Sequence, residues 1–242
     1  MKAARLDKLL ANLGYGSRRE IQALARAGAI RLDGAELSDA GARIPLAEDL
    51  PARLSVDGEA LDPLPGLCLM LHKPAGVTCS HKEAGPLVYG LFPERWRRRD
   101  PPLSTVGRLD KDTSGLLLVT DDGALLHRII APKANVAKRY RVTLDRPLKG
   151  DEEAVLAAGT LMLEGEERPL LPVGFEAQDA THCAVTLTEG RYHQVRRMFA
   201  ALGNHVTALH RDRIGGLDLP ADLPPGGYRL MDAAAIAAVF AG

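Results

Sequence analysis

The chain has 242 residues, enough for one large domain or for a small domain joined to a larger one. Hydrophobic residues make up 46% of it and charged residues 26%, as in a globular protein with a sizeable core. No apolar run approaches the roughly 18–20 residues of a membrane-spanning helix, and the first residues lack the apolar segment of an export signal. The three cysteines contain no Cys-x-x-Cys pair, which argues against a disulfide scaffold or a zinc finger. We therefore expect a reduced, cytoplasmic protein with no membrane partner.

The net charge is zero, but basic and acidic residues are segregated along the chain. Basic side chains prevail in residues 1–31 and 128–149, whereas acidic side chains prevail in 151–179. A neutral molecule with one basic face can still bind a polyanion, because that face governs the affinity. An ordinary solvated surface would have the same composition, so both interpretations stay open at this level.

The first sixty residues have the pattern of a compact module with two short helices and a small sheet. Leucines at helical spacing in residues 6–13 stop at Gly14, which suits the end of a helix. Ser17 and Glu20 form the capping-box pattern with which a second helix begins. On pattern alone, an RNA-binding module and a helix-turn-helix DNA-binding module fit nearly equally well. The candidate RNA contacts in this module are basic: Arg5, Lys8, Arg18, Arg19 and Arg26.

Asp62-Pro63-Leu64-Pro65-Gly66 is the best linker in the chain, so we predict one domain at 1–62 and a second at 63–242. Beyond it, the pattern predicts strands at 67–71, 116–120, 140–144 and 184–187, and helices at 124–130 and 190–202. The last helix would carry Tyr192, Val195, Phe199 and Leu202 on one stripe. Residues 80–105, which include Arg97-Arg98-Arg99, are predicted to be an extended loop region. Because strands and helices mix without a regular βαβ rhythm, the predicted class is α+β.

Residues 107–120 and the following turn are the most distinctive segment, and they match two templates. In the first, a calcium-binding loop, the ligands would be Asp110, Asp112, Ser114, Gly115 and Asp121. The last of these is Asp where such loops carry a bidentate Glu. Prolines just upstream also oppose the helix that should enter the loop, and a strand is expected to follow it. These departures argue against calcium binding.

In the second template, the same segment resembles the G-R-L-D-x-x-[TS]-[ST]-G-L-L-L signature of RsuA-type pseudouridine synthases, in which the aspartate, here Asp110, is essential. Residues 138–142 resemble the family's K-x-Y-x-V motif, with Tyr140 as its active-site tyrosine. Residues 189–199 resemble its third motif, whose arginine, here Arg196, pairs with the catalytic aspartate. The first sixty residues resemble an S4 RNA-binding domain.

The resemblance implies a small S4-type helix and sheet domain followed by a larger synthase domain, built on a mixed, mainly antiparallel sheet with flanking helices and a central cleft. It implies isomerisation of a uridine in 16S ribosomal RNA, at uridine 516, by Asp110, Tyr140 and Arg196, without metal or organic cofactor. The partner would be 16S rRNA or a small-subunit assembly particle, and the protein a monomer. The alternatives are a synthase acting on 23S rRNA and a non-catalytic S4-type RNA-binding protein.

The expected chemistry explains why one carboxylate suffices. The reaction breaks the N1–C1′ bond of uridine, turns the uracil over and joins C5 to C1′. Because the leaving group is a delocalised uracil anion, the second carboxylate of ordinary glycoside hydrolysis is not required. Asp110 can either attack C1′ or remove the 2′ proton, and the sequence favours neither. Tyr140 offers a flat face for the base, and Arg108 can occupy the gap left by the flipped nucleotide. Further candidate RNA contacts in the third motif are Arg191, His193 and Gln194.

Overall fold

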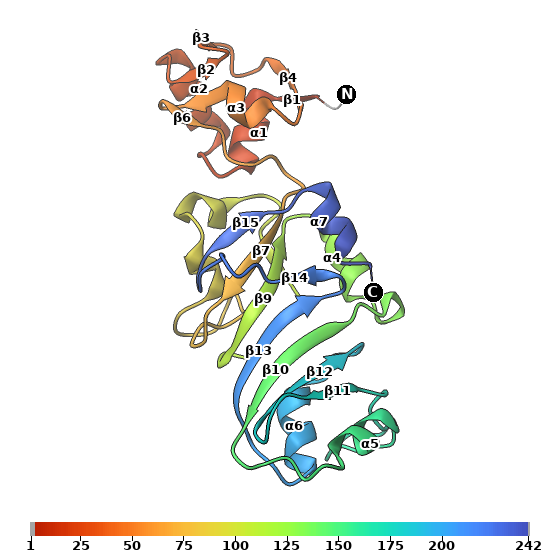
Figure 1. Cartoon of the computed structure of the whole chain (residues 1–242). Coiled ribbons are helices and arrows are strands. Elements are labelled where there is room, and N and C mark those ends of the chain that lie inside the picture. Colours follow the sequence, from red (N-terminus) through yellow and green to blue (C-terminus); the bar gives the residue numbers. More distant parts are fainter. Residues whose placement is uncertain (1–2, 242) are drawn as a thin grey trace. The chain divides into compact units, whose positions relative to one another are not determined.

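The computed structural model describes residues 3–241, which form two compact units. The first contains the chain up to Leu67 together with Tyr89–Ser104 and Thr120–Asp122, and the second contains Cys68–Val88, Thr105–Val119 and the chain from Gly123 onward. Figure 1 labels their helices and strands. Within the described range, no helix combines the length and the apolar character that crossing a membrane requires.

Short elements make up the first unit: β1 (Ala3–Arg5), α1 (Leu6–Asn12), α2 (Arg18–Arg26), β2 (Ile30–Leu32), β3 (Ala35–Glu36), β4 (Arg43–Pro45), α3 (Leu50–Arg53), β5 (Leu54–Val56) and β6 (Glu59–Ala60). Its sheet has the order β3-β2-β5-β6, and β1 pairs separately with β4. The capping box predicted at Ser17 and Glu20 is confirmed, since each side chain accepts the other's backbone N–H. Leucines and isoleucines from α1, α2, α3 and the strands form one buried core.

Arginine ion pairs connect Tyr89–Ser104 with the rest of the first unit. η1 (Val88–Leu91) and η2 (Glu94–Arg98) are single helical turns where we predicted an extended loop over 80–105. Arg95 donates to both carboxylate oxygens of Asp62, at 2.6 and 2.9 Å. Arg99 pairs with Asp121 at 2.9 Å, and both side chains are 1% exposed. The loop is therefore ordered by charge pairs between residues far apart in sequence, which local pattern does not report. Arg97 and Arg98 are exposed.

A nine-stranded mixed sheet forms the centre of the second unit (Figure 1). Its strands are β7 (Cys68–Lys73), β8 (Ser104–Val106), β9 (Thr113–Thr120), β10 (Lys138–Leu144), β11 (Gly174–Ala177), β12 (His182–Leu187), β13 (Val206–Ile214), β14 (Leu217–Asp218) and β15 (Tyr228–Leu230). The main order is β11-β12-β10-β13-β9-β7-β15. β13 runs parallel to β9, whereas the pairs β11–β12, β12–β10, β10–β13 and β7–β15 are antiparallel. The predicted α+β class and mainly antiparallel sheet are confirmed.

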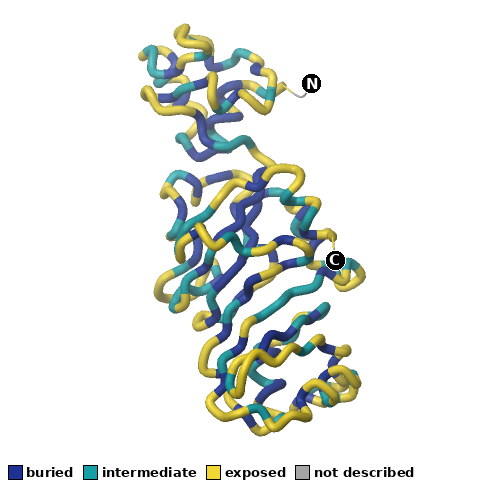
Figure 2. The backbone as a smooth tube through the Cα atoms, in the orientation of Figure 1, coloured by how far each residue is buried: buried dark blue, intermediate teal, exposed yellow. Residues whose placement is uncertain are grey.

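The helices of this unit are α4 (Gly123–Ile130), η3 (Pro132–Ala134), α5 (Glu152–Ala157), α6 (Gln194–Ala201) and α7 (Ala233–Ala238). Two apolar cores lie along the sheet. One joins α5 and α6 to β10, β12 and β13, and the other joins α4 and α7 to β7 and β9. β7 and β9 are buried over almost their whole length (Figure 2), as expected for strands in the middle of a covered sheet.

The helix predicted at 190–202 is wrong at its beginning. α6 begins at Gln194, because His193 adopts a left-handed backbone conformation with φ +47° and ends the helical path. Val195 and Phe199 lie in the core as predicted, but Tyr192 is 71% exposed. The periodicity was correct within α6 and failed in residues 190–193, where a turn replaces the first predicted helical turn.

Candidate active site

Asp110 lies in the loop that leads into β9. Its side chain is 32% exposed, and its Oδ1 lies 3.5 Å from Nε2 of His193. Its carbonyl oxygen accepts a hydrogen bond from the backbone N–H of Thr113 at 3.0 Å. The carboxylate is thus accessible while the main chain beneath it is tied into a turn.

Lys73, the last residue of β7, holds this loop from below. Its side chain is completely buried, and Nζ lies within hydrogen-bond distance of the carbonyl oxygens of Pro74, Asp110, Lys111 and Thr113, at 2.8–3.1 Å. Burial lowers the pKa of the Lys73 ammonium from its ordinary value, because the charged form is desolvated. Sequence reasoning missed this residue. The available signal was a lysine at the end of an apolar strand, directly before a proline.

Gly115 fixes how β9 meets β13. It lies opposite Arg211 in the parallel register and has φ +114°, where glycine is favoured. A Cβ at Gly115 would overlap the carbonyl oxygen of Arg211. The glycine of the signature segment therefore allows the close approach that brings Arg211 beside the strand that follows Asp110.

Tyr140 and Arg211 are neighbours on adjacent strands, β10 and β13. Nη1 of Arg211 donates to the Tyr140 hydroxyl at 3.3 Å, and Nε donates to the carbonyl oxygen of Leu116 at 2.8 Å. Arg211 is 3% exposed, and its buried Nη2 has no hydrogen-bond partner. Among residues 3–241, no carboxylate forms an ion pair with this guanidinium, whose role the sequence analysis missed.

The carboxylate of Asp110 and the guanidinium of Arg211 both lie close enough to Lys73 to influence its charge. The Asp110 carboxylate favours the charged form of Lys73, whereas the Arg211 guanidinium opposes it, so both act on the same buried ammonium. A partly exposed carboxylate, a phenol and a buried cation thus surround the beginning of β9. This set can hold an anion or polarise a planar ring.

Arg196 lies on α6, where its Nη1 donates to the carbonyl oxygen of Val206 at 2.9 Å. The resemblance implied that it pairs with Asp110. Within the described residues, the side chain that lies 3.5 Å from the Asp110 carboxylate is His193 and not Arg196. The pairing of Arg196 with Asp110 therefore stays a prediction.

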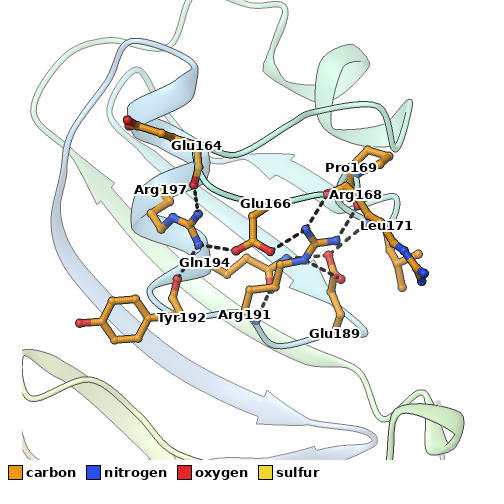
Figure 3. Close-up of polar contacts among 10 residues, drawn as sticks. All are labelled: Glu164, Glu166, Arg168, Pro169, Leu171, Glu189, Arg191, Tyr192, Gln194 and Arg197. Atoms are coloured by element: carbon orange, nitrogen blue, oxygen red, sulfur yellow. Dashed lines mark hydrogen bonds and ion pairs between the residues drawn. The ribbon is translucent and has the colours of Figure 1, made fainter.

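The turn before α6 is held by a network around Glu166, which we call the Glu166 cluster: Glu166, Glu189, Arg191, Gln194 and Arg197 (Figure 3). Glu166 accepts from Arg191 at 3.3 Å and from Arg197 at 2.8 Å. The hydrogen bond from Arg197 contributes most to lowering the pKa of Glu166. Arg191 also donates to the carbonyl oxygens of Arg168 and Pro169. The Arg191 guanidinium and the buried Gln194 side chain thus stabilise this turn. RNA contact by either residue stays a prediction.

The remaining candidate RNA contacts lie in both units. Arg5, Lys8, Arg18, Arg19 and Arg26 are exposed in the first unit, and Arg108 is exposed in the second, two residues before Asp110. Arg5 and Arg18 both bind the buried carboxylate of Asp7, at 3.0 and 2.7 Å, and remain half exposed. Hydrogen bonding to Arg5 is the largest cause that lowers the pKa of Asp7 to about 2.

The calcium-loop alternative lacks its structural context. A strand, β9, begins at Thr113, where the alternative requires a loop leading into a helix. Across the described part of the chain, no group of three or more His, Cys, Asp and Glu side chains is arranged to hold a metal ion.

Comparison with known proteins defines the class. Residues 68–201 match the family described as RNA pseudouridylate synthase, and residues 4–49 match the S4 domain. The first match covers more than half of the chain, so the chain belongs to the RNA pseudouridylate synthase family and is an isomerase by class.

Relatives match nearly the whole chain. It is 38% identical to the ribosomal small subunit pseudouridine synthase A of Pasteurella multocida, over 96% of this chain and 98% of that protein. It is 39% identical to the protein of the same name from Escherichia coli, over 97% and 99%. A crystal structure of a pseudouridylate synthase superposes with a TM-score of 0.68 and 36% identity, covering 97% of this chain and 99% of that one.

Proposed function

We propose that this protein converts one uridine of 16S ribosomal RNA into pseudouridine, and that uridine 516 is its target. The observation that carries the catalytic assignment is the geometry of the Asp110 loop. Its carboxylate is accessible, and its main chain is hydrogen-bonded to the buried ammonium of Lys73. The choice of small-subunit RNA is supported by the names of relatives that match the chain almost from end to end.

In the proposed reaction the N1–C1′ bond breaks, a C5–C1′ bond forms, C5 loses its proton and N1 gains one. The atoms therefore balance without a co-reactant. Asp110 either attacks C1′ or removes the 2′ proton, and both routes need an ionised carboxylate. Tyr140 supplies a flat face for the uracil, and its hydroxyl is fixed by Arg211. Arg196 would provide a counter-charge to Asp110.

The N-terminal unit would supply affinity and not chemistry. Its exposed basic residues are suited to phosphate contacts, which position a protein on RNA without reading its sequence. We place the protein in the cytoplasm, acting as a monomer on free 16S rRNA or on a small-subunit assembly particle. Comparing both substrates with the purified protein identifies which form is used.

The variant Asp110→Asn tests the catalytic proposal. Asn keeps the size and one acceptor but removes the charge, so turnover should fall at least about 100-fold while RNA affinity and melting temperature stay near wild type. Tritium release from 5-tritiated uridine in rRNA measures turnover. A folded variant that releases tritium at the wild-type rate contradicts the assignment. Mapping pseudouridines in rRNA from a strain lacking the protein tests the target, and a missing site in 23S rRNA would favour the alternative substrate.

A further inference from the structure

Tyr192 combines an exposed ring with a fixed backbone. Its side chain is 71% exposed, more than any other large hydrophobic side chain described in residues 3–241. The ring stacks on the ring of His193, with centroids 3.9 Å apart and planes 16° from parallel. An aromatic ring that serves only packing would be expected in the core.

The Glu166 cluster holds the main chain that carries this ring. Arg197 donates to the carbonyl oxygen of Tyr192 at 3.2 Å and to Glu166, so it links the turn to α6. Arg191, directly before the tyrosine, is tied to Glu166 and Glu189. In Figure 3 the Tyr192 ring points away from the Glu166 cluster, while its carbonyl group points toward Arg197. The main chain on both sides of the ring is therefore held by hydrogen bonds and ion pairs, while the ring itself stays exposed.

The stacked pair extends from the catalytic carboxylate to the protein surface. The inner ring, His193, lies 3.5 Å from Asp110, and the outer ring, Tyr192, stacks on it. His193 reaches this position only through its left-handed backbone conformation, which is unusual for a residue other than glycine. The residues on either side of it are tied together: the Gln194 side-chain oxygen accepts from the Arg191 N–H at 2.8 Å, and the Gln194 N–H donates to the Arg191 carbonyl oxygen at 3.2 Å. These contacts close the turn in which His193 adopts its conformation.

We infer that Tyr192 is a binding site for a nucleobase next to the reacting uridine, an inference that rests on the proposed function. Turning a uridine out of its stack leaves a neighbouring base without a stacking partner. Unstacked bases in RNA bind most often to the faces of aromatic side chains. The reacting sugar must reach Asp110, so a ring one stacking distance beyond His193 is placed for the neighbouring nucleotide and not for the target uracil.

The experiment uses an rRNA fragment that the wild-type protein converts, and measures dissociation constants and tritium release. Tyr192→Ala should weaken binding about 5- to 150-fold, the range found for loss of one base–aromatic stack, while Tyr192→Phe should bind like wild type. Because the ring is exposed, the melting temperature of both should be unchanged. Phe240→Ala is the matched control, since Phe240 is a partly exposed aromatic ring that contacts Arg128 and should not affect binding.

Fragments with a single abasic nucleotide locate the partner. Removing the stacked base should weaken binding to the wild-type protein but not to Tyr192→Ala, and this non-additive effect should occur at one position adjacent to the target. Additive effects at every position, or coupling to the target nucleotide itself, would overturn the inference, as would wild-type affinity of Tyr192→Ala. A wild-type protein that converts no rRNA would instead contradict the proposed function, so the two failures are distinguishable.

Discussion

Lys73 and Asp110 are joined through the main chain: the ammonium of the first donates to the carbonyl oxygen of the second at 3.1 Å. The catalytic candidate is thus positioned by a buried cation that never touches its carboxylate. The same ammonium also serves the carbonyl oxygens of Lys111 and Thr113, so a single side chain shapes the turn from which Asp110 projects.

Replacing Lys73 by Met should therefore loosen the loop. The change leaves several buried carbonyl oxygens without their donor, and each such loss costs about 1–3 kcal/mol. We expect the free energy of unfolding to fall by about 3 kcal/mol or more, and turnover to fall further than stability explains when assayed well below the melting temperature. Lys111→Met, in the same loop but exposed, should have neither effect. Wild-type unfolding of Lys73→Met in urea would contradict this role.

The buried pair of Arg99 and Asp121 should stabilise the first unit. Asp121→Asn leaves the guanidinium buried and uncompensated, and breaking such a pair typically costs about 3–5 kcal/mol. Glu94→Gln removes the partner of Arg98 in an ion pair whose side chains are 71% and 68% exposed, so it should change stability by less than about 1 kcal/mol. Urea denaturation measures both. If both variants change the free energy of unfolding by the same small amount, the attraction between Arg99 and Asp121 does no more than offset the cost of desolvating them.

The sequence predicted best the elements that depend on residues close together in the chain. The capping box at Ser17 and the strand after Asp110 follow from local spacing, and the structure contains both. Lys73 and Arg211 escaped because their importance comes from partners reached across the sheet, which no local period encodes. Tyr192 was misplaced for a related reason. Its spacing matches that of the helix, but the left-handed backbone of His193 makes α6 begin only after it, at Gln194.

His210 predicts a pH dependence of stability. Burial is the largest cause that lowers its pKa below the ordinary 6.5, nearby His72 and Arg141 lower it further, and Asp212 opposes them. Its Nδ1 lies 2.9 Å from the Ser114 hydroxyl. Because the folded protein binds this proton less readily than the unfolded chain, the stability contributed by neutral His210 is fully present above about pH 6.5 and is lost as the pH falls through the lowered pKa.

Comparing wild type with His210→Gln isolates this contribution. The difference between their free energies of unfolding should shrink as the pH falls from about 8 to about 5, because only the wild type then loses the neutral histidine. His205→Gln, which replaces an exposed histidine by the same residue, is the matched control. A difference that is constant over this range would mean that His210 does not titrate differently in the two states.

The last prediction concerns how Arg211 acts on Tyr140. Arg211 holds the tyrosine hydroxyl with Nη1 and the Leu116 carbonyl oxygen with Nε, and its Nη2 is buried beside them without a partner. Lysine keeps the charge but cannot reproduce this planar fork, so Arg211→Lys should lower kcat about 10- to 100-fold with little change in KM. If the arginine acts through the hydroxyl, Arg211→Lys should change kcat little in a protein that already carries Tyr140→Phe. The double variant should then have the kcat of Tyr140→Phe alone. Losses that multiply in the double variant would show that Arg211 acts on the RNA independently of Tyr140.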